Sequence, residues 1–317
     1  IFETNRTGAR FIDALARAAG RGVDVRVLLD GMGELQAFPR AGTLLKKRKV
    51  RVARFLPPRL VPPSVHINLR THRKVLVVDG NVAFTGGMNI GDRHLGQNLD
   101  NPSRVVDVHF RIEGPVTQQL RQVFLEDWAF CTGEQTIVPP EVCGWAGRAI
   151  CRTIVDGPNE DLDRLATILV GAISSAKDRV SIMTPYFLPS REIISALQTA
   201  ALRGVKVDVI LPSKNNLFFV HWATRNMLWE LLQRGVRVHY QPPPFVHSKL
   251  FLVDDCYAQI GSANLDPRSL RLNFELVVEI YDRETTTNIA AHVETCRKKS
   301  REISLAEMDM RGLPARV

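Results

Sequence analysis

A histidine followed two residues later by a lysine occurs twice in this chain, each time in similar surroundings. Residues 71–94 read THRKVLVVDGNVAFTGGMNIGDRH, and residues 246–266 read VHSKLFLVDDCYAQIGSANLD. Five residue types recur at a constant spacing of 175 residues: His72 and His247, Lys74 and Lys249, Asp79 and Asp254, Gly86 and Gly261, and Asn89 and Asn264. Because chance does not repeat five types at one spacing, the chain is predicted to contain two related halves.

The paired His and Lys side chains are suited to chemistry on a phosphate group. Residues two apart in an extended strand project to the same side, so His72 and Lys74 are expected to point together, as are His247 and Lys249. A lysine neutralises charge on phosphate oxygens, while an imidazole attacks phosphorus or transfers a proton. Each half therefore supplies one candidate catalytic pair.

The motif aspartates are expected to have a different role. Asp79 lies seven residues after His72, which is about 23 Å along an extended strand at ~3.3 Å per residue. The odd spacing also turns Asp79 to the opposite side of the strand. Asp79, which is followed by Gly80 and Asn81, is therefore predicted to stabilise the start of a hairpin turn, and Asp254 is predicted to do the same in the second half.

The strand that returns from each hairpin carries a second set of candidate residues. Gly87 and Ser262, together with Asn89 and Asn264, come back level with the histidines, where small residues would let a phosphate approach. The Ser262 hydroxyl and the two amides are expected to donate hydrogen bonds to phosphate oxygens. Gly87 and Gly261 are expected to line the position of the substrate.

Each imidazole also needs a carboxylate that fixes its tautomer. The next strand of each half offers one candidate, Asp107 in VVDVHFRIEG and Glu275 in LNFELVVEI. Both carboxylates precede alternating apolar residues, so both are expected to point into the same cleft.

The elements that must hold these residues are also repeated. An amphipathic helix, an Arg-Gly turn and an apolar strand are predicted over 10–31 and again over 192–213. A helix end and a strand follow in each half, over 44–55 and over 231–242. Helices and strands that alternate in this way predict α/β lobes with largely buried sheets.

The repeat also predicts where the halves begin and end. We expect a first lobe over 1–131, a linker over 132–150 where periodicity fails, and a second lobe over 151–317. The second half starts with a helix and a strand over 162–187, whereas IFETN at the start of the chain matches only the end of that strand. The sequence therefore predicts that about 25 residues of helix and strand precede Ile1.

Composition narrows the class of protein. The chain has 317 residues, 45% hydrophobic and 24% charged, which is typical of a soluble globular protein. It contains no apolar run of the length that a transmembrane helix needs, and its five cysteines do not form a disulfide framework. The net charge of +9 favours an anionic partner, either a nucleic acid or an anionic lipid surface.

The doubled HxKxxxxD pattern with a downstream G-G/S-x-N resembles the phospholipase D superfamily, and the resemblance covers nearly the whole chain. It implies a two-lobed α/β/α fold with mixed sheets and a single active site between the lobes. It also implies a covalent phosphohistidine intermediate, with no metal or other cofactor. By the family pattern, His72 is the expected nucleophile, and His247 is the expected acid and base.

Two further stretches are similar to bacterial cardiolipin synthases: PYFLPSREIISALQTAALRGVKVDVILPSK and GSANLDPRSLRLNFE. This similarity implies phosphatidyl transfer between two phosphatidylglycerol molecules, on an anionic membrane surface at the cytoplasmic face of a bacterial inner membrane. SRVVD before Asp107 departs from the family, which usually has a Trp there. The alternatives are a phospholipase D-type phosphodiesterase, a nuclease of the same superfamily, and a lipid-binding module without catalysis.

Other residues are expected to be structural. Four of the histidines outside the motif, His94, His109, His221 and His239, are predicted to be packed. The aromatic stretch 217–232 has the spacing of a buried helix stripe, although a lipid-facing patch is the alternative. The proline-rich segment 55–67 is either a structural loop or a membrane contact, and the basic run 296–302 is expected to be a solvated face.

Overall fold

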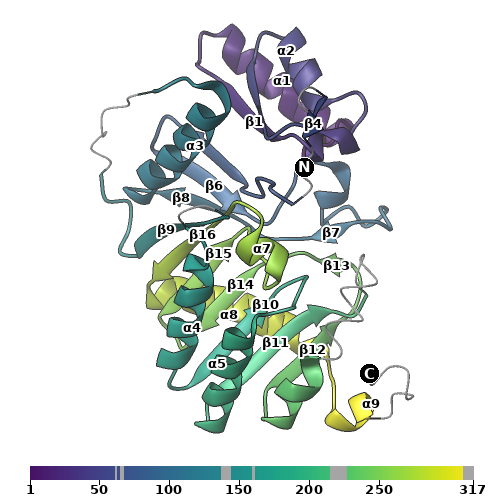
Figure 1. The fold of residues 1–317 in the computed structure, drawn as a ribbon, viewed down its shortest axis with the longest axis vertical. Helices are drawn as coiled ribbons and strands as arrows, with labels where there is room; N and C mark the ends of the chain where they lie inside the picture. Colours follow the sequence, from purple (N-terminus) through teal and green to yellow (C-terminus); the bar gives the residue numbers. More distant parts are fainter. Residues whose placement is uncertain (61–62, 65–67, 137–143, 159–160, 215–226, 310–317) are drawn as a thin grey trace.

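The structure, a computed structural model, describes residues 1–60, 63–64, 68–136, 144–158, 161–214 and 227–309. It has two lobes that follow one another along the chain. Figure 1 shows the first half of the chain in the upper part of the molecule and the second half in the lower part. Each lobe combines helices with strands, which confirms the expected α/β class.

The second lobe is built around one eight-stranded mixed sheet. Its strand order is β17-β12-β11-β10-β14-β15-β16-β9. Strand β10 is central, because it pairs in parallel with β11 and antiparallel with β14. In chain order the elements of this lobe are β9 (Ile150–Asp156), α4 (Arg164–Ser175), β10 (Arg179–Met183), α5 (Arg191–Leu202), β11 (Lys206–Pro212), β12 (Arg237–Gln241), β13 (Phe245–Val246), β14 (Leu250–Val253), β15 (Tyr257–Gly261), α7 (Pro267–Arg271), β16 (Glu275–Tyr281), α8 (Arg283–Lys298), β17 (Arg301–Glu302) and α9 (Leu305–Asp309).

The first lobe has two main sheets, of two and three strands. Strands β1 and β2 pair in parallel, and β5, β6 and β8 form an antiparallel sheet. In chain order the elements of this lobe are α1 (Arg6–Gly20), β1 (Arg26–Asp30), η1 (Gly33–Gln36), α2 (Ala41–Lys47), β2 (Arg51–Phe55), β3 (Arg59–Leu60), β4 (Pro63–Ser64), β5 (Val75–Val78), β6 (Val82–Gly86), η2 (Asp92–His94), β7 (Val105–Val106), β8 (His109–Glu113) and α3 (Val116–Thr132).

The matched elements of the two lobes are arranged alike, but β9, α4 and β10 have no counterpart among the described residues of the first lobe. In the second lobe, β10 lies between β11 and β14. Among the described residues of the first lobe, no strand lies between the matching strands β1 and β5. The isolated parallel bridge between Phe2 and Ile90 matches the one between Phe187 and Leu265, which agrees with the repeat alignment at the start of the chain. The helix and strand expected before Ile1 stay a prediction.

The predicted elements are confirmed by α1–β1 and α5–β11, by α2–β2, and by the two motif hairpins β5–β6 and β14–β15. One detail was wrong: the His and Lys of each motif do not lie inside the strand. Strand β5 starts at Val75 and β14 at Leu250, so the His-Lys pairs occupy the segments just before them. The predicted linker lies between α3 and β9, and its residues 137–143 are outside the described part of the chain.

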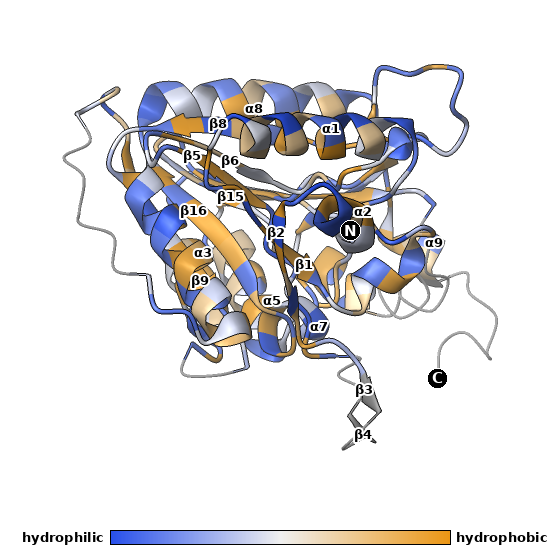
Figure 2. Cartoon of the chain, turned by 90° about the horizontal axis from the view of Figure 1, so that it is seen from above, coloured by the Kyte–Doolittle hydropathy of each residue, from blue (hydrophilic) through white to orange (hydrophobic). Residues whose placement is uncertain are grey.

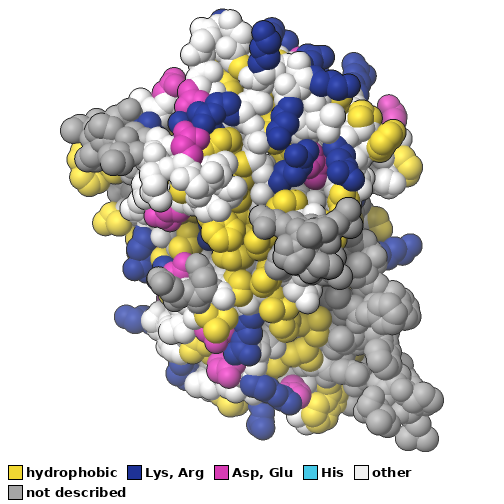
Figure 3. All heavy atoms as spheres, turned by 45° about the horizontal axis from the view of Figure 1, so that its top comes forward, with side chains coloured by type: hydrophobic (Ala, Val, Ile, Leu, Met, Phe, Trp, Pro, Cys, Tyr) yellow, Lys and Arg dark blue, Asp and Glu magenta, His cyan; other side chains and the backbone are white. Residues whose placement is uncertain are grey.

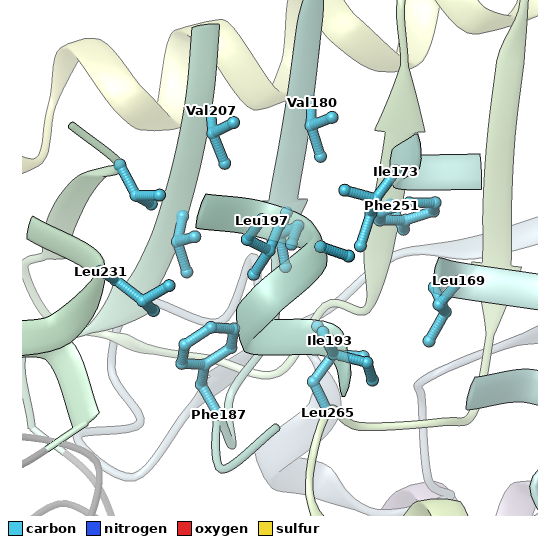
Figure 4. Packing of buried hydrophobic residues seen from close by; sticks show 14 of the residues in the cluster. Leu169, Ile173, Val180, Phe187, Ile193, Leu197, Val207, Leu231, Phe251 and Leu265 are labelled. Carbon is cyan, nitrogen blue, oxygen red and sulfur yellow. The ribbon is translucent and has the colours of Figure 1, made fainter. Parts of the chain in front are cut away.

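The hydrophobic core both fills the second lobe and joins the lobes. In the second lobe, apolar side chains of α4 and α5 pack on the strands, as Figure 4 shows for Ile173, Leu197 and Val180. A second cluster brings Ala83 and Leu120 of the first lobe against the apolar residues of β14, β15 and β16. Figure 2 shows helices on both sides of the mainly hydrophobic strands. The two halves are therefore held together by a shared core.

Several expectations about single residues can be compared with the structure. His94 and His239 are buried as predicted, whereas His109 is exposed, and His221 lies outside the described residues. The aromatic stretch also falls mostly outside them, but its last turns, which include Leu228, pack in the core. Within the described ranges, no helix has the length and apolar character needed to cross a membrane.

Candidate active site

The two motif histidines are each brought next to a carboxylate of the other lobe. Thr71 forms a parallel bridge with Phe274, and the amide of His72 donates to the carbonyl oxygen of Phe274 at 2.9 Å. The next residue after each bridge position is His72 in one lobe and Glu275 in the other. The bridge therefore places the imidazole and the carboxylate side by side.

The same arrangement occurs at the second motif. Strand β13 pairs in parallel with β7, with Val246 opposite Val106. The amide of His247 donates to the carbonyl oxygen of Val106 at 2.8 Å. The residues that follow are His247 and Asp107. The carboxylates are thus exchanged between the lobes, a pairing that spacing along the sequence does not show.

The first dyad is formed by His72 and Glu275. The His72 Nδ1 lies 3.0 Å from the Glu275 Oε2, and the Glu275 side chain is fully buried. The Ser262 hydroxyl donates to the same carboxylate oxygen at 2.5 Å, and the Asn273 amide lies 3.4 Å from the other one. A carboxylate held on Nδ1 fixes the tautomer and leaves Nε2 of His72 with a free lone pair.

The second dyad is formed by His247 and Asp107. The His247 Nδ1 lies 2.9 Å from the Asp107 Oδ2. The Asp107 Oδ1 accepts from the backbone amide of Val108 at 2.8 Å. A Cβ atom at Gly87 would lie only 2.5 Å from the Asp107 carboxylate. Glycine is therefore required at this position so that Asp107 can reach His247.

Burial and nearby charges give the carboxyl groups of the two dyads different pKa values. Burial lowers the pKa of His72 to about 4, against the opposing effect of Glu275, so the imidazole is neutral near pH 7. Burial would raise the pKa of Glu275, but His72 and Lys74 outweigh it and hold the pKa below its usual 4.5. Burial raises the pKa of Asp107 to about 6, even though Lys249 lowers it. Glu275 is thus the more acidic of the two carboxylic acids.

The two motif lysines are buried next to the histidines. Lys74 Nζ donates to the carbonyl oxygen of His72 at 2.6 Å. Lys249 Nζ donates to the carbonyl oxygen of His247 in the same way, and it also lies 2.9 Å from the ring Nδ1. Burial lowers the pKa of Lys74 to about 8 and that of Lys249 to about 7. A bound phosphate anion would raise both pKa values, because an opposite charge favours the ammonium form.

Three residues predicted to touch the substrate have other contacts. The Ser262 hydroxyl donates to Glu275, and the amide of Leu276 donates to the same hydroxyl oxygen, so Ser262 holds the carboxylate. Gly87 makes room for Asp107, as described above. A Cβ atom at Gly261 would lie 2.3 Å from the carbonyl oxygen of Leu276, so this glycine permits close strand packing. Protein groups lie beside these small residues, and the contact of the three residues with phosphate stays a prediction.

The two motif asparagines are placed at the site by different neighbours. The Asn89 Nδ2 lies 3.5 Å from Nε2 of His94. The Asn264 Nδ2 donates to the Ser269 hydroxyl at 3.1 Å. The predicted contact of both amides with phosphate stays a prediction.

The motif aspartates lie at the hairpin turns, away from the imidazoles. Asp79 and Asp254 both have left-handed backbones, with φ of 50° and 52°. The Asp254 carboxylate accepts from three successive backbone amides, those of residues 177–179, at distances down to 2.8 Å. Asp254 thus anchors the β14–β15 turn to the start of β10, which is the structural role that its parity suggested.

Three aromatic rings around His247 were missed by sequence reasoning. The ring centroids of His94, Tyr186 and Phe245 lie 6.2, 6.4 and 6.1 Å from that of His247. Burial lowers the pKa of His94 to about 3, so its ring is neutral. Tyr186 belongs to the PYFLP stretch, but nothing in its spacing from the motif indicated contact.

Among the described side chains, no three His, Cys, Asp or Glu residues gather as metal ligands.

Comparisons with known proteins agree with this geometry. The family described as "Cardiolipin synthase, PLD-like domain" matches residues 1–128 and 169–297. The chain is 34% identical to cardiolipin synthase 2 of Bacillus cereus and 32% identical to the major cardiolipin synthase of Bacillus subtilis, in both cases over its full length. It spans 62% and 66% of the length of these two relatives.

A solved structure also shares the fold. Phosphatidylserine synthase of Haemophilus influenzae matches the whole chain with a TM-score of 0.72 at 14% identity, and 84% of that protein is covered. The two-lobed arrangement with a shared interface is therefore the phospholipase D fold that the duplicated motif suggested.

Proposed function

Because the chain belongs to the cardiolipin synthase family with a phospholipase D-like domain, we propose that it transfers a phosphatidyl group between two phosphatidylglycerol molecules, giving cardiolipin and glycerol. The observation that carries this proposal is the pair of exchanged dyads, His72 with Glu275 and His247 with Asp107. Two imidazoles with different carboxylate partners are suited to a two-step transfer, in which one attacks phosphorus and the other moves protons.

His72 is the better nucleophile of the two. Its partner Glu275 has the lower carboxyl pKa of the two, so it stays ionised over a wider pH range than Asp107 and accepts the Nδ1 proton of His72. Nε2 is then free to attack the phosphorus atom of the donor lipid. A P–N bond forms, the bond between phosphorus and the glycerol head-group oxygen breaks, and the phosphatidyl group is left on His72.

His247 completes both steps as an acid and a base. Burial and then Lys249 hold its pKa well below 6.5 in the free protein. The donor's phosphate brings a negative charge beside the ring, which raises the pKa and favours the imidazolium. The imidazolium protonates the departing glycerol oxygen. In the second step, neutral His247 takes the proton from a hydroxyl of the acceptor lipid, whose oxygen attacks phosphorus and releases His72.

The lysines complete the site as counter-charges. Lys74 and Lys249 are the cations that the buried carboxylates hold near the two histidines. They stabilise the extra negative charge that develops on the phosphate oxygens in each transition state.

Since the substrate is a lipid, we propose that the protein acts while attached to the surface of a membrane, at its cytoplasmic face. Release of the protein from isolated bacterial membranes by high salt would test the peripheral attachment.

The proposed reaction is tested by incubating the purified chain with phosphatidylglycerol in a neutral detergent. Mass spectrometry of the lipids should show cardiolipin, and an enzymatic assay should show an equal amount of glycerol. His72→Asn is the control, because its amide can still donate to Glu275 but has no nucleophilic nitrogen. Phosphatidic acid as the sole product would instead indicate a phosphodiesterase, and cleavage of DNA or RNA without lipid turnover would indicate a nuclease.

A further inference from the structure

The positive charge of this protein is concentrated in one lobe. Residues 1–131 contain 20 Lys and Arg against 12 Asp and Glu, whereas residues 132–317 contain 22 against 21. The net charge of +9 therefore comes almost entirely from the first lobe. Both lobes supply one His-Lys pair to the site, so catalysis alone does not account for the difference.

Helix α1 carries much of this charge on its outer side. Arg10, Arg17 and Arg21 fall within an arc of about 40° on a helix with 3.6 residues per turn. Ile12 and Gly8 on the opposite side are buried against the lobe, and the three arginines are exposed. The matching helix α5 has Glu192 and Thr199 where α1 has Arg10 and Arg17.

The end of helix α2 adjoins this row of arginines. Lys46, Lys47 and Lys49 are exposed there, and Arg48 forms an ion pair with Asp13 of α1. Asp13 is the acidic residue between Arg10 and Arg17, so this ion pair neutralises it. We use the name basic face for six residues that have no ion pair with any other described residue: Arg10, Arg17, Arg21, Lys46, Lys47 and Lys49. Figure 3 shows Lys and Arg side chains spread over the upper end of the molecule, where the first lobe lies.

One member of the basic face is held in an unfavourable backbone conformation. Four matched helix ends have left-handed residues, with φ of 89° at Gly22, 92° at Gly204, 86° at Gly235 and 63° at Lys49. Lys49 and Gly235 close their helices with the same hydrogen bonds, Val50 N to Leu45 O and Val236 N to Leu231 O, both at 3.1 Å. Glycine adopts this conformation without strain and lysine does not. The lysine at this position is therefore not explained by the stability of the fold.

We propose that the basic face binds the surface of an anionic phospholipid bilayer. Six exposed cations without acidic partners complement a layer of phosphate head groups, and each basic residue close to such a surface strengthens binding. This inference rests on the proposed function, which supplies the reason for a lipid surface as the partner. The amide of Thr7 at the start of α1 donates to Asp92 at 2.7 Å, so the helix that carries three of the six cations is hydrogen-bonded to the segment that follows Asn89.

The test is cosedimentation of the 317-residue chain with vesicles of phosphatidylcholine alone or mixed with phosphatidylserine. The wild-type chain should bind the mixed vesicles and be released by salt. The triple variant Arg10→Gln/Lys46→Gln/Lys47→Gln should bind them about 100-fold more weakly, because each lost charge is expected to weaken binding roughly fivefold. The matched control is Lys177→Gln/Lys206→Gln/Arg234→Gln, which removes three exposed cations of the second lobe and should bind like wild type.

The variant Lys49→Gly distinguishes an effect on vesicle binding from an effect on the stability of the fold. It should raise the melting temperature, because glycine relieves the backbone strain, and yet weaken vesicle binding about fivefold. The reciprocal Gly235→Lys should lower the melting temperature and leave vesicle binding unchanged. A Lys49→Gly variant that binds vesicles like wild type would remove the support that the strained backbone gives to the proposal.

Three results would overturn the inference. The first is equal binding by the first-lobe triple variant and wild type, and the second is an equal loss in the second-lobe control. The third is a loss of DNA binding by the first-lobe variant without any loss of vesicle binding, since it would identify a nucleic acid as the partner. Turnover of phosphatidylglycerol in neutral detergent is measured in parallel and should be unchanged in all variants. A wild-type chain without such turnover would refute the proposed function and leave the vesicle result to be judged separately.

Discussion

Asp79 and Asp254 occupy matched positions in the two lobes, and both have left-handed backbones at the start of a hairpin turn. Asp254 accepts hydrogen bonds from three backbone amides before β10, whereas the exposed Asp79 carboxylate accepts none among the described residues. The partners of Asp254 lie at the start of β10, and the matching segment of the first half is the one that the repeat predicts before Ile1. In this chain, the two motif aspartates are therefore expected to contribute differently to the free energy of unfolding.

The carboxylates of the two dyads differ in a similar way. Glu275 is held by Ser262 and stays more acidic than usual, whereas Asp107 rests against Gly87 and has its pKa raised by burial to about 6. Two copies of one motif therefore create two unlike imidazoles. In the proposed mechanism, this difference rather than the motif itself divides the roles of nucleophile and proton carrier.

Substitution of the two histidines should give the largest effects. His72→Asn and His247→Asn are each expected to lower kcat by about 10⁴-fold or more, and the double variant should be little worse, because the groups act as a unit. With a donor that has a good leaving group, His247→Asn should still accumulate a phosphatidyl adduct on His72, detected by mass spectrometry of peptides. An adduct on His247 in the His72→Asn variant would reverse the roles.

Removal of the carboxylates should sharpen the contrast between the dyads. Glu275→Gln is expected to lower kcat by about 10³-fold and Asp107→Asn by about 10²-fold, since orienting carboxylates contribute on this scale. Because burial raises the pKa of Asp107 to about 6, kcat/KM should fall as the pH drops below that value and Asp107 becomes protonated. Asp107→Asn should lack this fall and Glu275→Gln should keep it. A fall that persists in Asp107→Asn would show that another group titrates.

Exchange of the small residues beside the carboxylates should have intermediate effects. Gly87→Ser is expected to lower kcat/KM by about 100-fold, because its Cβ would displace Asp107 and misplace His247. Ser262→Gly should cost only about tenfold, the equivalent of one hydrogen bond to a carboxylate. Both variants are measured on phosphatidylglycerol in detergent, after their melting temperatures show that they are folded. Equal losses in the two variants would indicate that the dyads are equivalent.

Replacement of the motif aspartates should affect stability more than activity. Asp254→Ala is expected to lower the free energy of unfolding by about 2 kcal/mol, comparable to the loss of a helix cap, and Asp79→Ala by less than about 0.5 kcal/mol. Chemical denaturation at several pH values measures both. Folding lowers the pKa of Asp254 below 3.8, so its contribution is present above that pH and is lost as the pH falls through the lowered pKa. A large loss in Asp79→Ala would contradict the structural difference between the turns.

Much of the fold could be predicted from the sequence, because hydrophobic periodicity and the repeat act locally. The matched helices, strands and hairpins required only spacing along the chain. Asp107 and Glu275 were found for the same reason, as the carboxylates on the strand that follows each hairpin. Their roles with His247 and His72 remain predictions until the variants are measured.

The exchange of partners could not be predicted, because it depends on how the lobes face one another. No spacing along the chain brings His72 to Glu275 rather than to Asp107. The contacts of Ser262 with Glu275 and of Gly87 with Asp107 could not be predicted for a related reason. A small residue leaves space, but sequence does not tell whether substrate or a neighbouring carboxylate fills it.

Two parallel strand pairings join the lobes, one between Thr71 and Phe274 and one between Val246 and Val106. They are related to each other like the two matching contacts of an isologous dimer interface, but both lie within one chain. In such an interface each protomer completes the site of the other, so neither lobe alone contains a working imidazole–carboxylate pair. The two protomers of a homodimer have the same sequence, so the two halves of its site must be identical. In one covalent chain, a substitution in one half need not occur in the other. Glutamate opposite aspartate, serine opposite glycine and a charged lobe opposite a nearly neutral one are forms of asymmetry open to this chain and closed to a symmetric pair.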